Sequence, residues 1–322
     1  MTAFRLGTRG SPLALVQARA VASRVAERSP HRCELVIIRT SGDQLADRPL
    51  SEAGGKRLFV KEIEDALLSG AVDLAVHSSK DLPAELPAGL EIGAVLPRED
   101  PADVLVHAGT GPGEFRGLLA RLPPAARVGT GSVRRVAQLR GLLPQARFEL
   151  IRGNIDTRLR KLDRGDYDVL VLASAGLRRL GLADRISAAI PPEVCVPAPG
   201  QGIVAIEIRA GDAGVRGALE AVGDADTAAA FDAERALVAA LGGGCQLPIG
   251  ALCRTVGGEL DLLGLVASLD GSTVVRHRQR GPRGSAPALG RQVAEALIDQ
   301  GAGEILARAR AEGTSIADRH GP

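Results

Sequence analysis

Short runs of aliphatic and β-branched residues alternate with amphipathic stretches along nearly all of the 322-residue chain. Residues 4–8 have the pattern of a strand, Ser11-Pro12 is typical of a helix start, and 33–40 (CELVIIRT) has the pattern of a second strand. Strands and helices in alternation pack as largely parallel sheets covered by helices, so the pattern predicts an α/β fold. The length exceeds the usual size of one domain.

The chain also repeats part of itself. Gly7-Thr8-Arg9-Gly10-Ser11 is echoed by Gly129-Thr130-Gly131-Ser132, each between an expected strand and an expected helix, and 73–82 is echoed by 168–177. This predicts two similar α/β lobes that face each other across a cleft. Helix amino termini at such a cleft carry unpaired N–H groups and a positive dipole end, which suit anionic ligands.

Two segments have the composition of connections between the lobes, 97–103 (PREDPAD) and 196–202 (VPAPGQG). The apolar strand expected at 203–208 would return to the first lobe's sheet. After Asp224 the pattern changes to one helix, three strands and two helices, which indicates a smaller α+β domain. The expected domains are residues 1–100 plus 200–220, residues 101–199, and residues 221–322.

Composition excludes several functions. Aromatic residues make up 2% of the chain and Trp is absent, so binding nucleic acid by base stacking is not expected. The four cysteines (33, 195, 245 and 253) form no Cys-x-x-Cys pair, so neither a disulfide framework nor a metal site is expected. No apolar run approaches ~20 residues and no signal-like segment opens the chain. We expect a cytoplasmic protein without membrane contact.

Cys245 lies in Leu241-Gly-Gly-Gly-Cys-Gln-Leu-Pro248, on a Gly-rich turn after an expected helix. Three glycines leave the thiol exposed with room beside it. The local sequence leaves a functional and a structural cysteine equally open. The other three cysteines are interpreted as structural, as cysteines among apolar residues usually are.

Asp81 follows His77-Ser78-Ser79-Lys80 at the end of an apolar strand. Ligands of open α/β sheets bind beyond the carboxyl ends of strands, so a carboxylate here is well placed to act on one. The alternative is a helix-capping Asp before Leu82-Pro83. His77 is interpreted as a packed or hydrogen-bonded histidine.

Only four of the 40 basic residues are lysines. Any one arginine could belong to a solvated face, but several stand at expected strand ends or helix starts. Because the arginine fork binds carboxylates at two points, this set predicts a polyanion site in the cleft. Its members are Arg9, Arg134, Arg135, Arg152, Arg158, Arg178 and Arg179.

In this order, the motifs resemble those of the porphobilinogen deaminase (hydroxymethylbilane synthase) family over almost the whole chain. The shared runs are TRGSPLAL (8–15), SGD (41–43), GGKRLFVKEIEDALL (54–68), AVHSSKDLP (75–83), REDPAD (98–103), GTGSVRR (129–135), LIRGNIDTRLRKLD (150–163), AGLRRLGL (175–182), PAPGQG (197–202) and GGCQLPIG (243–250). Any one run would be weak evidence, whereas the ordered set is specific.

The resemblance implies two lobes like those of periplasmic binding proteins and a third domain whose Cys245 holds a dipyrromethane cofactor through a thioether. It makes Asp81 the catalytic carboxylate. Matching cofactor-binding positions are Ser78, Lys80, Asp43, Thr130, Ser132, Arg134, Arg135, Gly153 and Arg158. Matching substrate-binding positions are Arg9, Gln17, Arg152 and Arg179, and Lys56 and Phe59 match a lid loop.

The implied function is that of a transferase of porphyrin and heme biosynthesis. It would condense four porphobilinogen molecules onto the dipyrromethane primer, with loss of ammonia, and release the linear tetrapyrrole hydroxymethylbilane by hydrolysis. No metal is implied, and the resemblance suggests a monomer. Two other readings are a two-lobed anion-binding module without catalysis and a Cys–His hydrolase using Cys245 and His77.

Three positions depart from the family pattern. Glu52 stands where many members carry lysine, Arg57 where glycine is common, and Gly131 where serine is common. The first two put the contacts of the lid loop in doubt.

Overall fold

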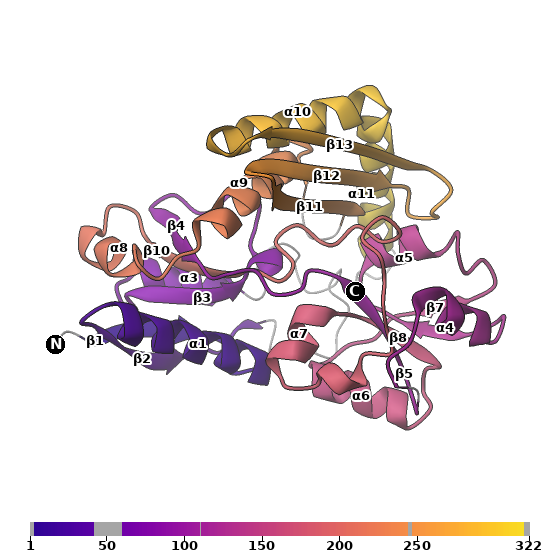
Figure 1. Ribbon diagram of the computed structural model, residues 1–322, viewed down its shortest axis with the longest axis horizontal. Coiled ribbons are helices and arrows are strands. Elements are labelled where there is room, and N and C mark those ends of the chain that lie inside the picture. Colours follow the sequence, from indigo (N-terminus) through magenta and orange to yellow (C-terminus); the bar gives the residue numbers. More distant parts are fainter. Residues whose placement is uncertain (1–2, 42–59, 110, 244–246, 319–322) are drawn as a thin grey trace.

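A computed structural model describes residues 3–41, 60–109, 111–243 and 247–318, with side chains up to residue 312. Its strands form three separate sheets, and the chain crosses twice between the first two (Figure 1). No helix among the described residues combines the length and the apolar character needed to span a membrane.

The first lobe is a five-stranded sheet in the order β2-β1-β3-β10-β4. Its strands are β1 (Ala3–Thr8), β2 (Arg32–Ile37), β3 (Leu74–Ser78), β4 (Leu90–Val95) and β10 (Val204–Arg209). On one face of the sheet pack α1 (Pro12–Arg28) and α8 (Ala213–Leu219), and on the other packs α3 (Lys61–Leu68). β10 is antiparallel to both of its neighbours, and the other pairings that form the sheet are parallel. The expected return of 203–208 to this sheet is confirmed.

The second lobe has the order β7-β6-β8-β5-β9. Its strands are β5 (Asp103–His107), β6 (Arg127–Gly129), β7 (Arg147–Glu149), β8 (Val169–Ala173) and β9 (Ala188–Ala189). Its helices are α4 (Phe115–Arg121), α5 (Val133–Leu139), α6 (Ile155–Asp163), α7 (Ser174–Arg179) and the single turn η2 (Ala183–Arg185). Only β5 runs against its neighbours.

The structure confirms the internal echo, because the two sheets match position by position. β1 and β6 are the second strands, β3 and β8 the third, and the reversed strands β10 and β5 the fourth. Each lobe also carries the same ion pair. Asp73 accepts hydrogen bonds from the backbone N–H (2.8 Å) and the guanidinium of Arg5, and Asp168 accepts them from the backbone N–H (2.7 Å) and the guanidinium of Arg127.

The third domain consists of a three-stranded antiparallel sheet and three helices, as its sequence pattern predicts. The strands are β11 (Ile249–Val256), β12 (Glu259–Ala267) and β13 (Val274–Pro282), and the helices are α9 (Ala225–Ala240), α10 (Ala286–Asp299) and α11 (Ala302–Asp318), with the turn η3 (Arg283–Ser285) before α10. One face of the sheet builds an aliphatic core with the helices, with Leu237, Leu262 and Val293 fully buried. On the opposite face, Leu252 and Leu265 pack against Ala137 of the second lobe.

The two crossing segments lie side by side between the lobes, in the centre of Figure 1. The Glu99 N–H donates to the Gly202 carbonyl at 3.0 Å. Gly202 has a φ of +87°, and a Cβ there would lie 2.2 Å from the carbonyl oxygen of Glu99, so only glycine fits. The contact therefore fixes how closely the two segments approach.

Glu234 of α9 fastens both crossings to the third domain. Its side chain has no exposure and accepts hydrogen bonds from Arg98 Nη1 (2.6 Å), from the Gly200 N–H (2.6 Å) and from the Cys253 N–H (2.7 Å). Arg98 belongs to the first crossing, Gly200 to the second, and Cys253 to β11. One carboxylate thus joins three parts of the fold.

Replacing Glu234 should destabilise the whole molecule. Glu234→Ala leaves the Arg98 guanidinium largely buried without its partner, and breaking a buried pair in this way costs about 3–5 kcal/mol. The matched control is Glu295→Ala on α10, where the side chain is exposed. Denaturant titration of both variants measures the difference, and equal free energies of unfolding would show that Glu234 does not hold the crossings.

Candidate active site

The residues from Ser79 to Asp81 form a single 3₁₀ turn (η1) at the carboxyl end of β3. The Ser79 N–H donates to the Ile203 carbonyl at 3.0 Å. Gly200, with a φ of +72°, lies so close that a Cβ would be 2.9 Å from Ser79 Cβ. The second crossing therefore packs directly against the turn that carries Lys80 and Asp81.

Asp81 is half-buried and is the last residue of this turn. The chain is extended at Leu82, and no helix begins after it before β4. The alternative reading of Asp81 as a helix cap is therefore wrong. Its carboxylate sits beyond the end of a strand, where the α/β pattern predicts ligand contacts.

The pKa of Lys80 is shifted by burial and by charges that include those of second-lobe residues. Burial lowers the pKa of Lys80 to about 8, the charge of Asp81 opposes that shift, and the charge of Arg135 adds to it. Asp103 and Arg134 also act on Lys80. The contact runs through the second crossing, because Gly200 packs against the turn and the next residue, Gln201, donates from Nε2 to Asp103 Oδ1 at 2.9 Å. Asp103 in turn pairs with the first arginines of α5, so the turn and α5 belong to one cluster.

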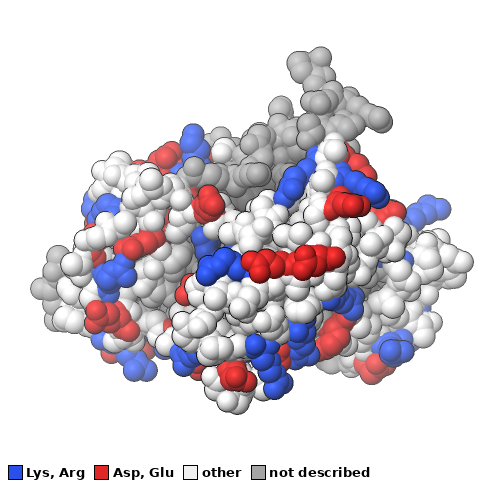
Figure 2. All heavy atoms as spheres, turned by 90° about the horizontal axis from the view of Figure 1, so that it is seen from above, with Lys and Arg blue, Asp and Glu red and all other residues white. Residues whose placement is uncertain are grey.

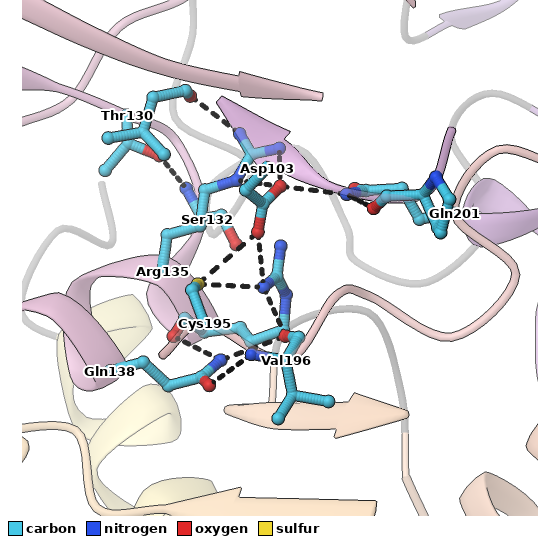
Figure 3. Close-up of polar contacts among 11 residues, drawn as sticks. Asp103, Thr130, Ser132, Arg135, Gln138, Cys195, Val196 and Gln201 are labelled. Atoms are coloured by element: carbon cyan, nitrogen blue, oxygen red, sulfur yellow. Dashed lines mark hydrogen bonds and ion pairs between the residues drawn. The ribbon is translucent and has the colours of Figure 1, made fainter. Parts of the chain in front are cut away.

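Arg134 and Arg135, at the start of α5, are almost completely buried and share one carboxylate, that of Asp103 (Figure 3). Arg134 Nη1 lies 2.7 Å from Asp103 Oδ2 and donates to the Val196 carbonyl at 2.6 Å. Arg135 donates to Asp103 Oδ1 from Nε (3.0 Å) and Nη2 (2.7 Å), and to the Val171 carbonyl from Nη1. The sequence placed both arginines in the site but did not reveal this partner.

Asp103 is the functional candidate that sequence reasoning missed. Burial alone would raise its pKa, but the charges and hydrogen bonds of Arg134 and Arg135 outweigh burial and hold the pKa well below its usual range. The signals were its place at the end of the connection 97–103 and its inclusion in the shared run REDPAD (98–103), but we assigned it no role.

Arg152 and Arg158 are two further arginines of the second lobe in the predicted site. Burial lowers the pKa of Arg158 to about 10, the charges of Arg135 and Arg152 lower it further, and the charge of Asp81 opposes them. Arg158 Nε donates to the Gly153 carbonyl at 2.8 Å. The buried Nε of Arg152 has no hydrogen-bond partner among the described residues. The charges of Arg135 on α5 and of Asp81 thus both act on Arg158 of α6.

Other candidates make contacts at three places. Gln17 and Ser78 lie within hydrogen-bond distance of each other (2.9 Å from Nε2 to Oγ), which ties α1 to the end of β3. Thr130 is buried, and its hydroxyl accepts from the Ser132 N–H at 3.3 Å just before α5. Arg179 Nη2 donates to the Gly202 carbonyl at 2.7 Å, so it binds the second crossing.

Several predicted positions lie elsewhere. Arg9 follows β1, and Gly131 precedes α5. Arg178 is half-exposed and pairs with Asp100. His77 is packed as expected, with Nε2 3.1 Å from Glu207 Oε2 in the sheet interior. Cys195 and Cys253 are buried and Cys33 is half-buried. Cys245, Asp43, Glu52, Lys56, Arg57 and Phe59 lie outside the described residues.

The fold and the site define a class of protein with two matched α/β lobes and a third domain. In its site, the Asp103 carboxylate holds a pair of buried arginines next to the turn that carries Asp81. Comparison with known proteins identifies the family. The model of "Porphobilinogen deaminase, dipyromethane cofactor binding domain" matches residues 4–217, and that of "Porphobilinogen deaminase, C-terminal domain" matches residues 228–299. The chain therefore belongs to the porphobilinogen deaminase family, as its motifs indicate.

Curated relatives agree over nearly the full length. The chain is 50% identical over 304 residues to the porphobilinogen deaminase of Syntrophobacter fumaroxidans, covering 94% of this chain and 96% of the relative. It is 50% identical over 308 residues to that of Desulforudis audaxviator, covering 95% and 97%. Among solved structures, the Bordetella pertussis BvgS VFT2 domain is 15% identical with a TM-score of 0.40, covering 69% of this chain and 85% of the domain.

The pKa of Lys80 can be tested in a Cys245→Ala chain, which we expect to carry no cofactor. The neutral amine reacts with acylating reagents, so the labelling rate of Lys80 should rise with pH and level off above about 8. Peptide mass mapping measures this rate, with the exposed Lys61 as an internal comparison. A rate for Lys80 that still climbs between pH 9 and pH 10 contradicts the prediction.

Proposed function

We propose that the chain condenses four porphobilinogen molecules onto a dipyrromethane cofactor held by Cys245 and then releases hydroxymethylbilane by hydrolysis. Family membership over the whole chain makes it a transferase of tetrapyrrole synthesis. The observation that supports the details is the contact between the turn of Lys80 and Asp81 and the second crossing, whose Gln201 shares the Asp103 carboxylate with the buried Arg134 and Arg135. The reading as an anion-binding module without catalysis has no support in the family matches.

The described residues fit a polyanionic cofactor. Each pyrrole ring derived from porphobilinogen carries two carboxylates. Arg134 and Arg135 share one protein carboxylate, which leaves positive charge uncompensated in a buried place. The buried Nε of Arg134 and the buried Nε of Arg152 have no hydrogen-bond partner among the described residues. Unsatisfied buried donors are costly, so they favour an acceptor such as a ligand carboxylate.

Residues from both lobes would hold the cofactor. We assign to it Ser78, Lys80, Asp43, Thr130, Ser132, Arg134, Arg135, Gly153 and Arg158, and to incoming substrate Arg9, Gln17, Arg152 and Arg179. When bound, the cofactor supplies a terminal pyrrole whose free α-carbon is the nucleophile. The arginines bind carboxylates through charge-assisted hydrogen bonds that fix orientation as well as charge.

Asp81 would act on the substrate itself. When the carbon–nitrogen bond of the aminomethyl group breaks, ammonia leaves and the pyrrole becomes cationic. The charge spreads onto the pyrrole nitrogen, and an ionised carboxylate placed in advance stabilises it. Formation of the new carbon–carbon bond would pass the positive charge to the attacking pyrrole, and loss of the proton from its α-carbon would restore a neutral ring. Lys80 precedes Asp81 in the same turn and brings a positive charge next to this carboxylate.

The proposal also covers the domain boundaries, the localisation and the partners of the protein. The domain boundaries remain 1–100 plus 200–220, 101–199 and 221–322, which the membership of β10 in the first sheet supports. We also propose that the enzyme is a cytoplasmic monomer whose small-molecule substrate is porphobilinogen, with no nucleic-acid or membrane partner.

The intact mass of the purified chain tests the cofactor. We expect the native protein to be heavier than its sequence by one dipyrromethane unit, because the chain matches the dipyrromethane cofactor binding domain and the family motif GGCQLPIG implies attachment at Cys245. Cys245→Ala should lose both the added mass and turnover. Cys33→Ala, at a half-buried cysteine in β2, is the control and should keep both. Turnover by a parent chain of bare mass would refute covalent attachment.

Turnover of porphobilinogen tests Asp81. Asp81→Asn keeps the shape but removes the charge, and loss of one such electrostatic contact costs ~2.7–4 kcal/mol, about a hundred- to a thousand-fold in rate. Asp65→Asn, at an exposed carboxylate on α3, is the control and should be silent. A folded Asp81→Asn protein with near-parent turnover would remove Asp81 from the mechanism.

A further inference from the structure

We infer that Asp103 is a positioning residue for the reaction: it aims Arg134 and Arg135 and limits the positive charge that they present to bound carboxylates. This inference rests on the proposed function, because it assigns Asp103 a task toward the same ligands. Asp103 touches no group that reacts in the proposed mechanism.

Asp103 stands where the first crossing becomes β5, and its side chain has no exposure. Both carboxylate oxygens are engaged. Oδ1 accepts from Arg135 and from Gln201 Nε2 at 2.9 Å, and Oδ2 binds Arg134 at 2.7 Å and lies 3.4 Å from Cys195 Sγ. Gln201 and Cys195 belong to the second crossing or its approach, so Asp103 ties both arginines to the point where the chain passes between the lobes (Figure 3).

Two neighbouring residues on a helix do not point the same way. Arg134 and Arg135 nevertheless converge, because one carboxylate offers a separate oxygen to each. Their like charges repel each other, so without Asp103 nothing in the described contacts would draw the two guanidinium groups together. Arg134 has a second fixed contact at the Val196 carbonyl, and Arg135 has one at the Val171 carbonyl.

The charges of Asp103, Arg134 and Arg135 do not cancel, and their sum is positive. One carboxylate faces two arginines, and the charges of Arg134 and Arg135 also act on Lys80. A net positive charge is left, and the unpartnered Nε of Arg134 is a donor that Asp103 does not use. A ligand carboxylate can complete the set. If Asp103 lost its charge, a ligand carboxylate could take its place between the arginines, which would hold the ligand in the wrong position.

This gives a signature that a purely structural carboxylate would not produce. In Asp103→Asn the site becomes more positive, so anionic ligands should still be attracted, but they should bind out of register with Asp81. We expect the variant to gain the dipyrromethane mass and to show a KM for porphobilinogen no higher than that of the parent, with kcat lowered at least tenfold. A variant that only folded less well would give less active protein, but its kcat per loaded chain and its KM would both stay at the parent values.

Two further variants make the test decisive. Asp168→Asn removes the matched pair with Arg127 in the same lobe, and it should keep kcat and KM within twofold of the parent. Asp103→Glu keeps the charge but moves the carboxylate, so it should load and keep the parent KM. Its kcat should fall several-fold, which is a smaller loss than in Asp103→Asn. If Asp103→Asn does not fold, the Glu variant decides alone.

The measurements are intact mass, steady-state kinetics per loaded chain and a melting curve for each variant. Parent-like kcat in folded Asp103→Asn, or in Asp103→Glu when Asn does not fold, would overturn the inference. A folded Asp103→Asn chain that fails to load, or whose KM rises while kcat holds, would also overturn it. If the parent itself does not turn over porphobilinogen, the proposed function fails, and that result is distinct from a failure of Asp103 in an active enzyme.

Discussion

A carboxylate without access to water must find its partners inside the protein, since an unpaired buried charge is strongly destabilising. Asp103 and Glu234 are both in this position, and both meet the chain where it crosses between the lobes. Asp103 joins the first crossing to α5 and to the second crossing, and Glu234 joins the two crossings to the third domain. The third domain, the turn with Asp81 and the arginines therefore come from parts of the chain that share one buried polar centre.

The repeated lobes show how structural and functional residues are separated along the same strands. Each lobe carries an arginine–aspartate pair near the amino ends of its central parallel strands, Arg5 with Asp73 and Arg127 with Asp168. The opposite ends of these strands carry the candidate site, including Lys80 and Asp81. Parallel strands end at a common edge, so one edge can be fixed by ion pairs while the other is available to a ligand.

Local patterns in the sequence were enough for the elements, the repeat and the return of β10. They also placed Asp81 beyond a strand end and the arginines near the start of α5. They could not reveal that Asp103 lies between Arg134 and Arg135, because that contact joins residues about thirty positions apart through the assembled sheet. Nor could they pair Glu234 with Arg98, or His77 with Glu207. In the sequence, a buried polar partner looks the same as an exposed one.

Burial explains why the candidate site uses arginines rather than lysines. The chain has a net charge of +2, and Figure 2 shows acidic and basic side chains interspersed on the described part of one face, without a broad field of one sign. Attraction of anions must then act at short range within the site, where salt screens it less. There, burial and like charges lower the pKa of Arg158 only to about 10, whereas they bring that of Lys80 to about 8. Arginine keeps its charge at neutral pH under conditions that bring lysine close to losing it, so a buried site for several carboxylates favours arginines, with lysine only where a carboxylate such as Asp81 is adjacent.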